Sequence, residues 1–235
     1  MAQAHHTARE SHQSNQLLSA VAEHMKLPLL YMRQHAELVR GGESFSPDII
    51  ESAADAGMML VDSYLYWQTI AHHTEGLDME QASLTSLLYD VAHSLDKIAK
   101  SQNAQVQLDI YGRYGPVMTH PKTLHAAMLS LGLAYIEAVQ DDAPVVLGVH
   151  KSRWGLVTGV YSENTAVTSD MLTCAKQLSG SARQPMPATS HTSMSGFIIA
   201  DALLDVLPAK LRVAKHRRMS GLALTLAPNP QLALL

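Results

Sequence analysis

Histidine is the residue type in this chain with the widest chemistry, because imidazole both binds metals and transfers protons near neutral pH. The sequence holds 13 histidines in 235 residues. His72 and His73 are adjacent, so their side chains point apart, and His120 and His125 are five residues apart with Pro121 between them. Neither spacing is typical of a metal site. We therefore predict no metal.

A basic cluster near the C-terminus is a second candidate for binding chemistry. The basic cluster comprises Lys210, Arg212, Lys215, His216, Arg217 and Arg218. It could bind an acidic partner or nucleic acid, although solvated strand ends and a hairpin turn are the more usual source of such a pattern. The net charge of −4 and the pI near 6.3 give no overall electrostatic case for nucleic acid. We therefore expect nucleic acid not to be a partner.

Composition indicates a globular chain with a sizeable core. Hydrophobic residues make up 47% and charged residues 16%, which suits one large domain or two small ones. The single cysteine, Cys174, excludes an internal disulfide and suits a reducing compartment. No apolar run reaches roughly 18 residues, and residues 1–16 lack an apolar signal core. We expect a cytoplasmic protein with no membrane segment that receives its signal from a partner.

Two long helices are predicted in the first third of the chain. Residues 1–13 are polar, and we predict a disordered tail there. Apolar residues at spacings of three and four predict a helix of about 25 residues that starts at Leu17, is kinked at Pro28 and ends at Gly41-Gly42.

The second helix begins with Ser46 as N-cap and Pro47 at the first helical position, and it extends to about Ala71. Residues 14–75 then form a helical hairpin. A hairpin cannot bury both of its apolar stripes alone, so we expect a homodimer in which two copies make a four-helix bundle.

Residues 76–235 show a mixed pattern that predicts a second, α+β domain with helices on one face of a sheet. Helices are expected over residues 84–101, 121–140 and 196–207, with a further helix starting at Thr168 or Ser169. Strands are expected over residues 106–111, 145–150, 155–161, 210–215 and 221–226.

This order of elements, over residues 14–228, resembles the histidine-kinase core, in which a dimerisation hairpin precedes a Bergerat-type ATPase domain. Residues 23–29 (EHMKLPL) resemble the family's phosphoacceptor motif, His-Glu-x-x-x-Pro-Leu. Residues 117–125 resemble the stretch that leads into the ATPase helix bearing an essential Asn. The resemblance implies an α/β sandwich of mixed sheet and helices after the hairpin.

The acceptor motif departs from the family pattern. When Pro28 is aligned with the family proline, Glu23 falls at the phosphorylated histidine and His24 at its acidic neighbour. One helical step rotates a side chain by about 100°, so His24 could accept a phosphoryl group only if the donor approached differently. His24 remains the candidate phosphoacceptor, and Glu23, Lys26 and Pro28 are the candidate partner-docking residues.

The nucleotide motifs depart further. Tyr135 falls near the Asn that holds Mg²⁺ in the family. Ser162 replaces the adenine-binding Asp of Asp-x-Gly-x-Gly, while Asn164 and Ala166 replace its glycines, and Gly196 alone survives from the glycine-rich lid motif. Side chains thus stand where bare backbone would approach phosphates. We predict a degenerate pocket and no cofactor.

Four functions remain open. The resemblance favours a dimeric adaptor or pseudokinase of two-component signalling that docks a response-regulator receiver domain or a sensor kinase. A histidine phosphotransferase using His24 is the second reading, since bacterial phosphotransferases also pair a hairpin with a vestigial ATPase domain. A divergent active histidine kinase is the third. A nucleic-acid or regulator-binding module using the basic cluster is the fourth.

Overall fold

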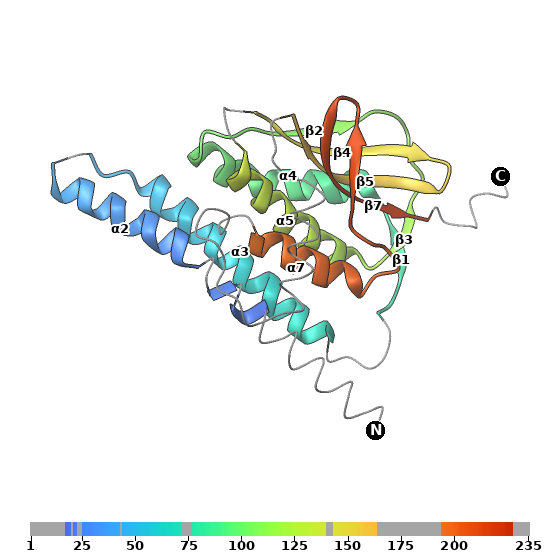
Figure 1. The fold of residues 1–235 in the computed structure, drawn as a ribbon, viewed down its shortest axis with the longest axis horizontal. Helices are drawn as coiled ribbons and strands as arrows, with labels where there is room; N and C mark the ends of the chain where they lie inside the picture. Colours follow the sequence, from blue (N-terminus) through green and yellow to red (C-terminus); the bar gives the residue numbers. More distant parts are fainter. Residues whose placement is uncertain are drawn as a thin grey trace, which may run out of the picture.

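The computed structural model describes residues 17–19, 21–22, 25–42, 44–71, 77–139, 143–163 and 194–227. Two helices lead into an α+β body (Figure 1). The helices are α2 (Lys26–Arg40), α3 (Pro47–Ala71), α4 (Leu84–Ser101), α5 (Pro121–Ala138) and α7 (Met194–Asp205). The strands are β1 (Glu80–Ala82), β2 (Val106–Ile110), β3 (Val117–Thr119), β4 (Val145–Ser152), β5 (Gly155–Ser162), β6 (Arg212–His216) and β7 (Met219–Leu226).

The first pair of helices, α2 and α3, forms the expected hairpin, and Pro28 lies near the start of α2. Helix α2 begins at Lys26, with Met25 as its N-cap, so Pro28 lies in the first helical turn. A proline there loses no hydrogen bond, because the first N–H groups of a helix have no partner within it. Residues 17–19 and 21–22, before α2, are also helical, and the Met25 N–H bonds the Val21 carbonyl oxygen at 2.9 Å. Residues 23 and 24 lie outside the described part of the chain, so the predicted kink stays a prediction. Gly41 caps the other end, as predicted, and Gly42 takes a φ of 100°.

A five-stranded mixed sheet forms the centre of the α+β body, in the order β2-β4-β5-β7-β6. Only the pairing of β2 with β4 is parallel, and the other three are antiparallel. Strands β1 and β3 pair in a separate two-stranded sheet, in which β1 comes directly before α4 and β3 directly before α5. These three-residue strands were not predicted, because they are too short to show an alternating pattern.

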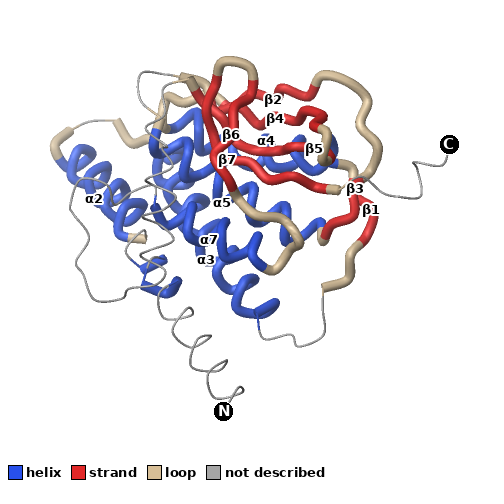
Figure 2. The backbone as a smooth tube through the Cα atoms, turned by 45° about the vertical axis from the view of Figure 1, so that its right-hand side comes forward, coloured by secondary structure: helices blue, strands red, loops and turns tan. Residues whose placement is uncertain are grey.

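Helices cover one face of the large sheet, and α3 lies on the far side of that helical layer (Figure 2). A single apolar core joins α3, α4, α5 and α7 to the inward-facing strand residues, among them Leu147, Val160 and Leu222. A much smaller cluster lies on the opposite, outer face of the sheet. It consists of Val146, Val157, Tyr161, Met219 and Ala223, and we call it the outer cluster.

The predicted elements of the α+β body recur with small changes at their ends. Helix α4 matches the prediction at both ends, since Ser83 caps it by accepting a hydrogen bond from the Ser86 N–H. Strand β4 ends two residues later than predicted, β6 begins two residues later, and β7 begins two residues earlier. The tail over residues 1–13, the helix from Thr168 or Ser169 and the domain boundary near residue 75 lie outside the described residues.

Candidate functional site

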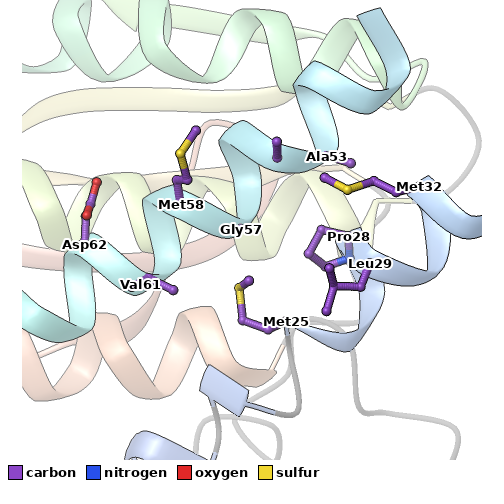
Figure 3. Close-up of a pocket in the computed structure, with 10 residues that line it drawn as sticks. Met25, Pro28, Leu29, Met32, Ala53, Gly57, Met58, Val61 and Asp62 are labelled. Atoms are coloured by element: carbon purple, nitrogen blue, oxygen red, sulfur yellow. The ribbon is translucent and has the colours of Figure 1, made fainter. Parts of the chain in front are cut away.

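The hairpin carries an apolar groove of about 300 Å³ between its two helices (Figure 3). Its lining is almost entirely aliphatic and sulfur-bearing, with one carboxylate at the rim. The lining residues are Met25, Pro28, Leu29, Met32, Ala53, Ala54, Gly57, Met58, Val61 and Asp62. A surface groove of this composition is typical of a protein-contact site, because a partner that covers it removes apolar surface from water.

Gly57 sets the closeness of the two helices at this groove. A Cβ atom at Gly57 would lie 3.2 Å from Met25 Cε and 3.4 Å from Pro28 Cγ. The missing side chain therefore lets the start of α2 rest directly on α3. Pro28 is buried by this contact, whereas Lys26, two residues earlier, is exposed.

Large apolar side chains around the groove remain open to solvent. Leu29 is 58% exposed, Met58 56% and Leu65 50%. Met58, Val61, Asp62 and Leu65 follow a spacing of three and four residues along α3, so they share one face of that helix. We call this face, together with the groove, the hairpin face.

The predicted docking residues fall partly on this surface. Lys26 and Pro28 lie at the start of α2, beside the groove. Glu23 and the candidate phosphoacceptor His24 lie outside the described residues, so their orientation stays untested. The groove begins at Met25, the residue that directly follows His24 in the chain.

The opposite face of α3 is buried against the helical layer. Leu60, Tyr64 and Trp67 lie in the common core, and the Tyr64 and Trp67 rings stack with centroids 6.3 Å apart. Hydrogen bonds flank this apolar contact at both ends. Ser52 Oγ lies 2.7 Å from Ser101 Oγ of α4.

Near the other end of α3, Tyr66 reaches the start of α5. Its hydroxyl lies 3.0 Å from Thr123 Oγ1 and 3.3 Å from His120 Nδ1. His120 is the N-cap of α5 and accepts the Thr123 N–H. This capping role occupies the imidazole of His120, one of the four histidines whose spacing argued against a metal site. His125 is half-buried, and desolvation by burial lowers its pKa, while Asp90 opposes that shift.

Lys97 of α4 adds an exposed ionic link to α3. Its Nζ lies 3.0 Å from Glu51 Oε2 and 3.1 Å from Asp55 Oδ2. The hydrogen bond with Glu51, followed by that with Asp55, raises the pKa of Lys97. Helix α3 therefore connects the hairpin face on one side with the α+β body on the other.

Two residues of the predicted degenerate nucleotide pocket, Tyr135 and Gly196, lie at the contact between α5 and α7. Tyr135 is 0% exposed, and its ring meets Phe197 edge-on with centroids 5.7 Å apart. Burial raises the pKa of the Tyr135 phenol well above its usual value, so it stays neutral. A neutral buried phenol is a poor substitute for a metal-binding amide oxygen.

Gly196, the one glycine retained from the lid motif, is explained by helix packing. A Cβ at this position would lie 2.5 Å from the Ser130 carbonyl oxygen and 2.8 Å from Ala134 Cβ, both on α5. Only glycine allows α7 to approach α5 this closely. Its presence therefore gives no argument for a phosphate-binding loop.

Ser162 lies at the end of β5, opposite Ser220 of β7. Its side chain is fully buried, and its hydroxyl makes no hydrogen bond with the described residues. The next two positions that the sequence assigned to the pocket, Asn164 and Ala166, lie outside the described residues. The structure thus brings Tyr135 and Gly196 to one helix–helix contact and leaves part of the predicted pocket untested.

A polar network on the outer face of the sheet was not found from the sequence. His216 Nε2 lies 3.0 Å from Asp109 Oδ2, and His216 Nδ1 lies 3.0 Å from His150 Nδ1. Arg217 binds the same carboxylate through Nε at 2.8 Å and Nη2 at 2.9 Å. The sequence signal for this network was Asp109 in the alternating run 106–110. A carboxylate that a strand buries on the face opposite its apolar residues needs a partner.

This network changes the interpretation of the basic cluster. His216 is only 6% exposed, so it is not a solvated strand end. Arg217 pairs with Asp109 but stays largely exposed in the hairpin turn, as the pattern of basic residues predicted. Arg212 donates to Thr225 Oγ1 across the β6–β7 pair. Among the described residues, no group of three or more His, Cys, Asp or Glu side chains is arranged to hold a metal ion.

No known protein family's sequence profile matches this chain, and no curated protein matches it. Solved structures do match it. The histidine kinase AdeS of Acinetobacter baumannii aligns with a TM-score of 0.54 at 10% identity, covering 87% of this chain and 96% of that one. The catalytic domain of the histidine kinase ThkA aligns at 0.51 and 11% identity, over 66% and 99% of the two chains.

Full-length ShkA in complex with AMPPNP aligns at a TM-score of 0.54 and 13% identity, covering 97% of this chain. The chain spans about half of ShkA, since the match covers 46% of that protein. The fold is that of a histidine-kinase core: a helical hairpin followed by an α+β domain like the kinase catalytic domain. No helix in the described part of the chain is long and apolar enough to cross a membrane.

Proposed function

We propose that this protein is a dimeric component of a two-component signalling system that docks a receiver domain or a sensor kinase and does not use ATP. The observation that carries the proposal is the tight α5–α7 contact. Tyr135 stands near the position expected for a metal-binding Asn, and Phe197 and Gly196 pack α7 against the same helix. A nucleotide phosphate or its metal ion placed beside Tyr135 would have to displace side chains of this close-packed contact.

The hairpin face supplies the surface for association. Its exposed Leu29, Met58 and Leu65 need a partner, and a second copy of the chain would present the same face in return. Two hairpins joined in this way would form a four-helix bundle. The docking residues Lys26 and Pro28 would then lie on the same bundle as His24.

Titration calorimetry with ATP and Mg²⁺ tests the first part of the proposal. We expect no heat of binding at micromolar protein, and Tyr135→Asn should not restore it, because one carbonyl ligand does not reopen the α5–α7 contact. Micromolar affinity in the unmodified protein would refute the proposal. Sedimentation equilibrium tests dimerisation separately, and a monomer at all accessible concentrations would remove that part.

A histidine phosphotransferase is the second candidate, favoured by the position of the groove. The groove begins one residue after His24, so a receiver domain seated there in place of a second copy would bring its phosphorylated aspartate close to that histidine. The phosphoryl group would pass from the aspartyl phosphate to an imidazole nitrogen, and the aspartate carboxylate would leave. Incubation with a phosphorylated receiver domain should label the protein, and His24→Ala should abolish the label. Equal labelling of the variant would exclude this role.

A further inference from the structure

A second cavity, of about 460 Å³, opens between the first turns of α4 and α5. We call it the helix-start cavity. It is larger than the groove of the hairpin face, and it is separate from that groove. Its volume is within the usual range of sites that hold a small molecule. The lining residues are Ala82, Ser83, Ser86, Leu87, Asp90, Pro121, Lys122 and His125.

The small sheet of β1 and β3 holds the two helix starts side by side. Ala82 of β1 pairs with Val117 of β3, and each strand leads directly into its helix. Ser83 caps α4 and His120 caps α5, so both helices begin at fixed positions. The cavity between them is therefore present without a ligand, as in most small-molecule sites.

The walls of the helix-start cavity are mainly apolar. Ala82 and Leu87 are buried, and Pro121 contributes a partly buried ring. An aliphatic group that enters the cavity removes this apolar surface from water, which favours binding. The walls therefore suit the apolar part of a small ligand.

Two opposite charges, Asp90 of α4 and Lys122 of α5, line the same cavity. Both side chains are exposed, and among the described residues neither has an ion-pair partner, each other included. The other aspartate and lysine residues of α4 are all in ion pairs: Asp96 with Lys100, and Lys97 with carboxylates of α3. A ligand that carries both an ammonium and a carboxylate group pairs with both cavity charges at once.

His125 adds a polar group to the same cavity. Burial lowers its pKa, and the nearby carboxylate of Asp90 opposes that shift. The ring is therefore mostly neutral near pH 7 and offers one N–H donor and one acceptor nitrogen. No hydrogen bond joins this ring to another described residue, so both nitrogens are available to a ligand.

We propose that the helix-start cavity binds a small zwitterion with an apolar side chain, an α-amino acid such as leucine. The ammonium group of the ligand pairs with Asp90, and its carboxylate pairs with Lys122. Its aliphatic side chain lies against Leu87 and Pro121. The site shares no residue with the hairpin face, so it does not depend on the proposed docking function.

Three small molecules separate the groups of the ligand. Leucine carries both charges, leucinamide lacks the carboxylate, and 4-methylpentanoate lacks the ammonium group. We expect leucine to shift the backbone amide resonances of Ser86, Asp90 and His125 saturably, with a dissociation constant of about 1 mM, as for a ligand of this size in an open site. Each analogue should bind about threefold more weakly, because each loses one exposed ion pair.

Variants at the two charged positions test which group each residue binds. Asp90→Asn and Lys122→Gln should each weaken leucine binding about threefold. Each should also remove one preference of the unmodified protein. Asp90→Asn should bind leucine and 4-methylpentanoate equally, because the ammonium group has lost its partner. Lys122→Gln should bind leucine and leucinamide equally, because the carboxylate has lost its partner.

A matched pair of variants tests the location. Ser86→Trp places a large ring in the cavity and should abolish leucine binding, whereas Thr85→Trp, at the neighbouring exposed residue outside the lining, should leave it unchanged. No saturable shift with leucine up to about 20 mM would overturn the proposal. Binding that persists in Ser86→Trp would overturn it as well, and so would equal binding of leucine and both analogues by the unmodified protein.

Discussion

The hairpin face and the α5–α7 contact are two surfaces of opposite character within one fold. Between α2 and α3, Leu29 and Met58 stand more than half exposed around an open groove. Between α5 and α7, Tyr135 and Phe197 are almost completely buried, and Gly196 removes the last space between the helices. The groove on the hairpin is open to solvent, whereas the contact between α5 and α7 is close-packed.

This difference indicates which of the two surfaces is suited to binding a partner. A close-packed helix pair stabilises the fold and resists insertion of a ligand. An exposed apolar groove adds little to the stability of the monomer, but it supplies buried area when a partner arrives. The chain thus has the fold of a kinase core, and one exposed apolar groove of its described part lies on the hairpin.

The largest expected effect comes from truncating a buried side chain in the contact between α5 and α7. Tyr135→Ala should lower the free energy of unfolding by about 3–5 kcal/mol, the usual cost of truncating a buried aromatic ring. Tyr89 is exposed on α4, and Tyr89→Ala should change stability by less than about 0.5 kcal/mol. Urea denaturation of both variants measures the difference. Similar, small effects would mean that the α5–α7 region is an open pocket.

A second prediction concerns self-association through the hairpin face. Leu65→Glu places a carboxylate on the hairpin face, and it should weaken self-association by about 10–100-fold, because a buried charge opposes an apolar interface. The folded monomer should be little affected, since Leu65 is half exposed. Sedimentation equilibrium gives the dissociation constant. Tyr89→Glu is the matched control, and equal weakening by both variants would show that the interface is elsewhere.

Local signals in the sequence were enough to predict most elements. The helix predicted over residues 84–101 matches α4 at both ends, and Gly41-Gly42 gave the end of α2. The predicted kink at Pro28 stays a prediction, because residues 23 and 24, between the helical residues 17–19 and 21–22 and the start of α2, lie outside the described part of the chain. The close contact of Met25 with Gly57 could not be predicted, because these residues meet only in the folded hairpin.

The outer-face network could not be predicted in the same way. Asp109 and His216 are 107 residues apart, and they belong to strands at opposite edges of the sheet. No local pattern reports that a hairpin end bends over a sheet. The filling of the α5–α7 contact was partly visible, because Tyr135 and the lost glycines indicated bulk, but the packing role of Gly196 appeared only from its distance to Ser130.

A third prediction tests which contacts attach α3 to the α+β body. Tyr66→Phe removes the hydroxyl that reaches Thr123 and His120 at the start of α5. The loss should be about 0.5–1.5 kcal/mol, typical of one intramolecular hydrogen bond. Tyr89→Phe, at an exposed position, is the control and should be neutral. A neutral Tyr66→Phe would mean that apolar contacts alone hold α3 in place.

The smallest effect is expected from the exposed ionic link between α3 and α4. Lys97→Gln breaks the contacts with Glu51 and Asp55, but these groups are all substantially solvated, so water replaces most of the lost interaction. The melting temperature should fall by less than for Tyr66→Phe. The difference should vanish at about 1 M salt, where the screening length is near 3 Å.

Lys100→Gln is the matched control, because Lys100 pairs with Asp96 inside α4 and does not connect two helices. Both lysine variants should alter the melting temperature slightly, but only Lys97→Gln should increase amide exchange in the first turns of α3. A Lys97→Gln effect that survives high salt would place a strong ionic contact between hairpin and body. The exposed side of α3 would then owe its position to charge, and the contrast between an open, weakly held hairpin face and a filled helical core would have to be revised.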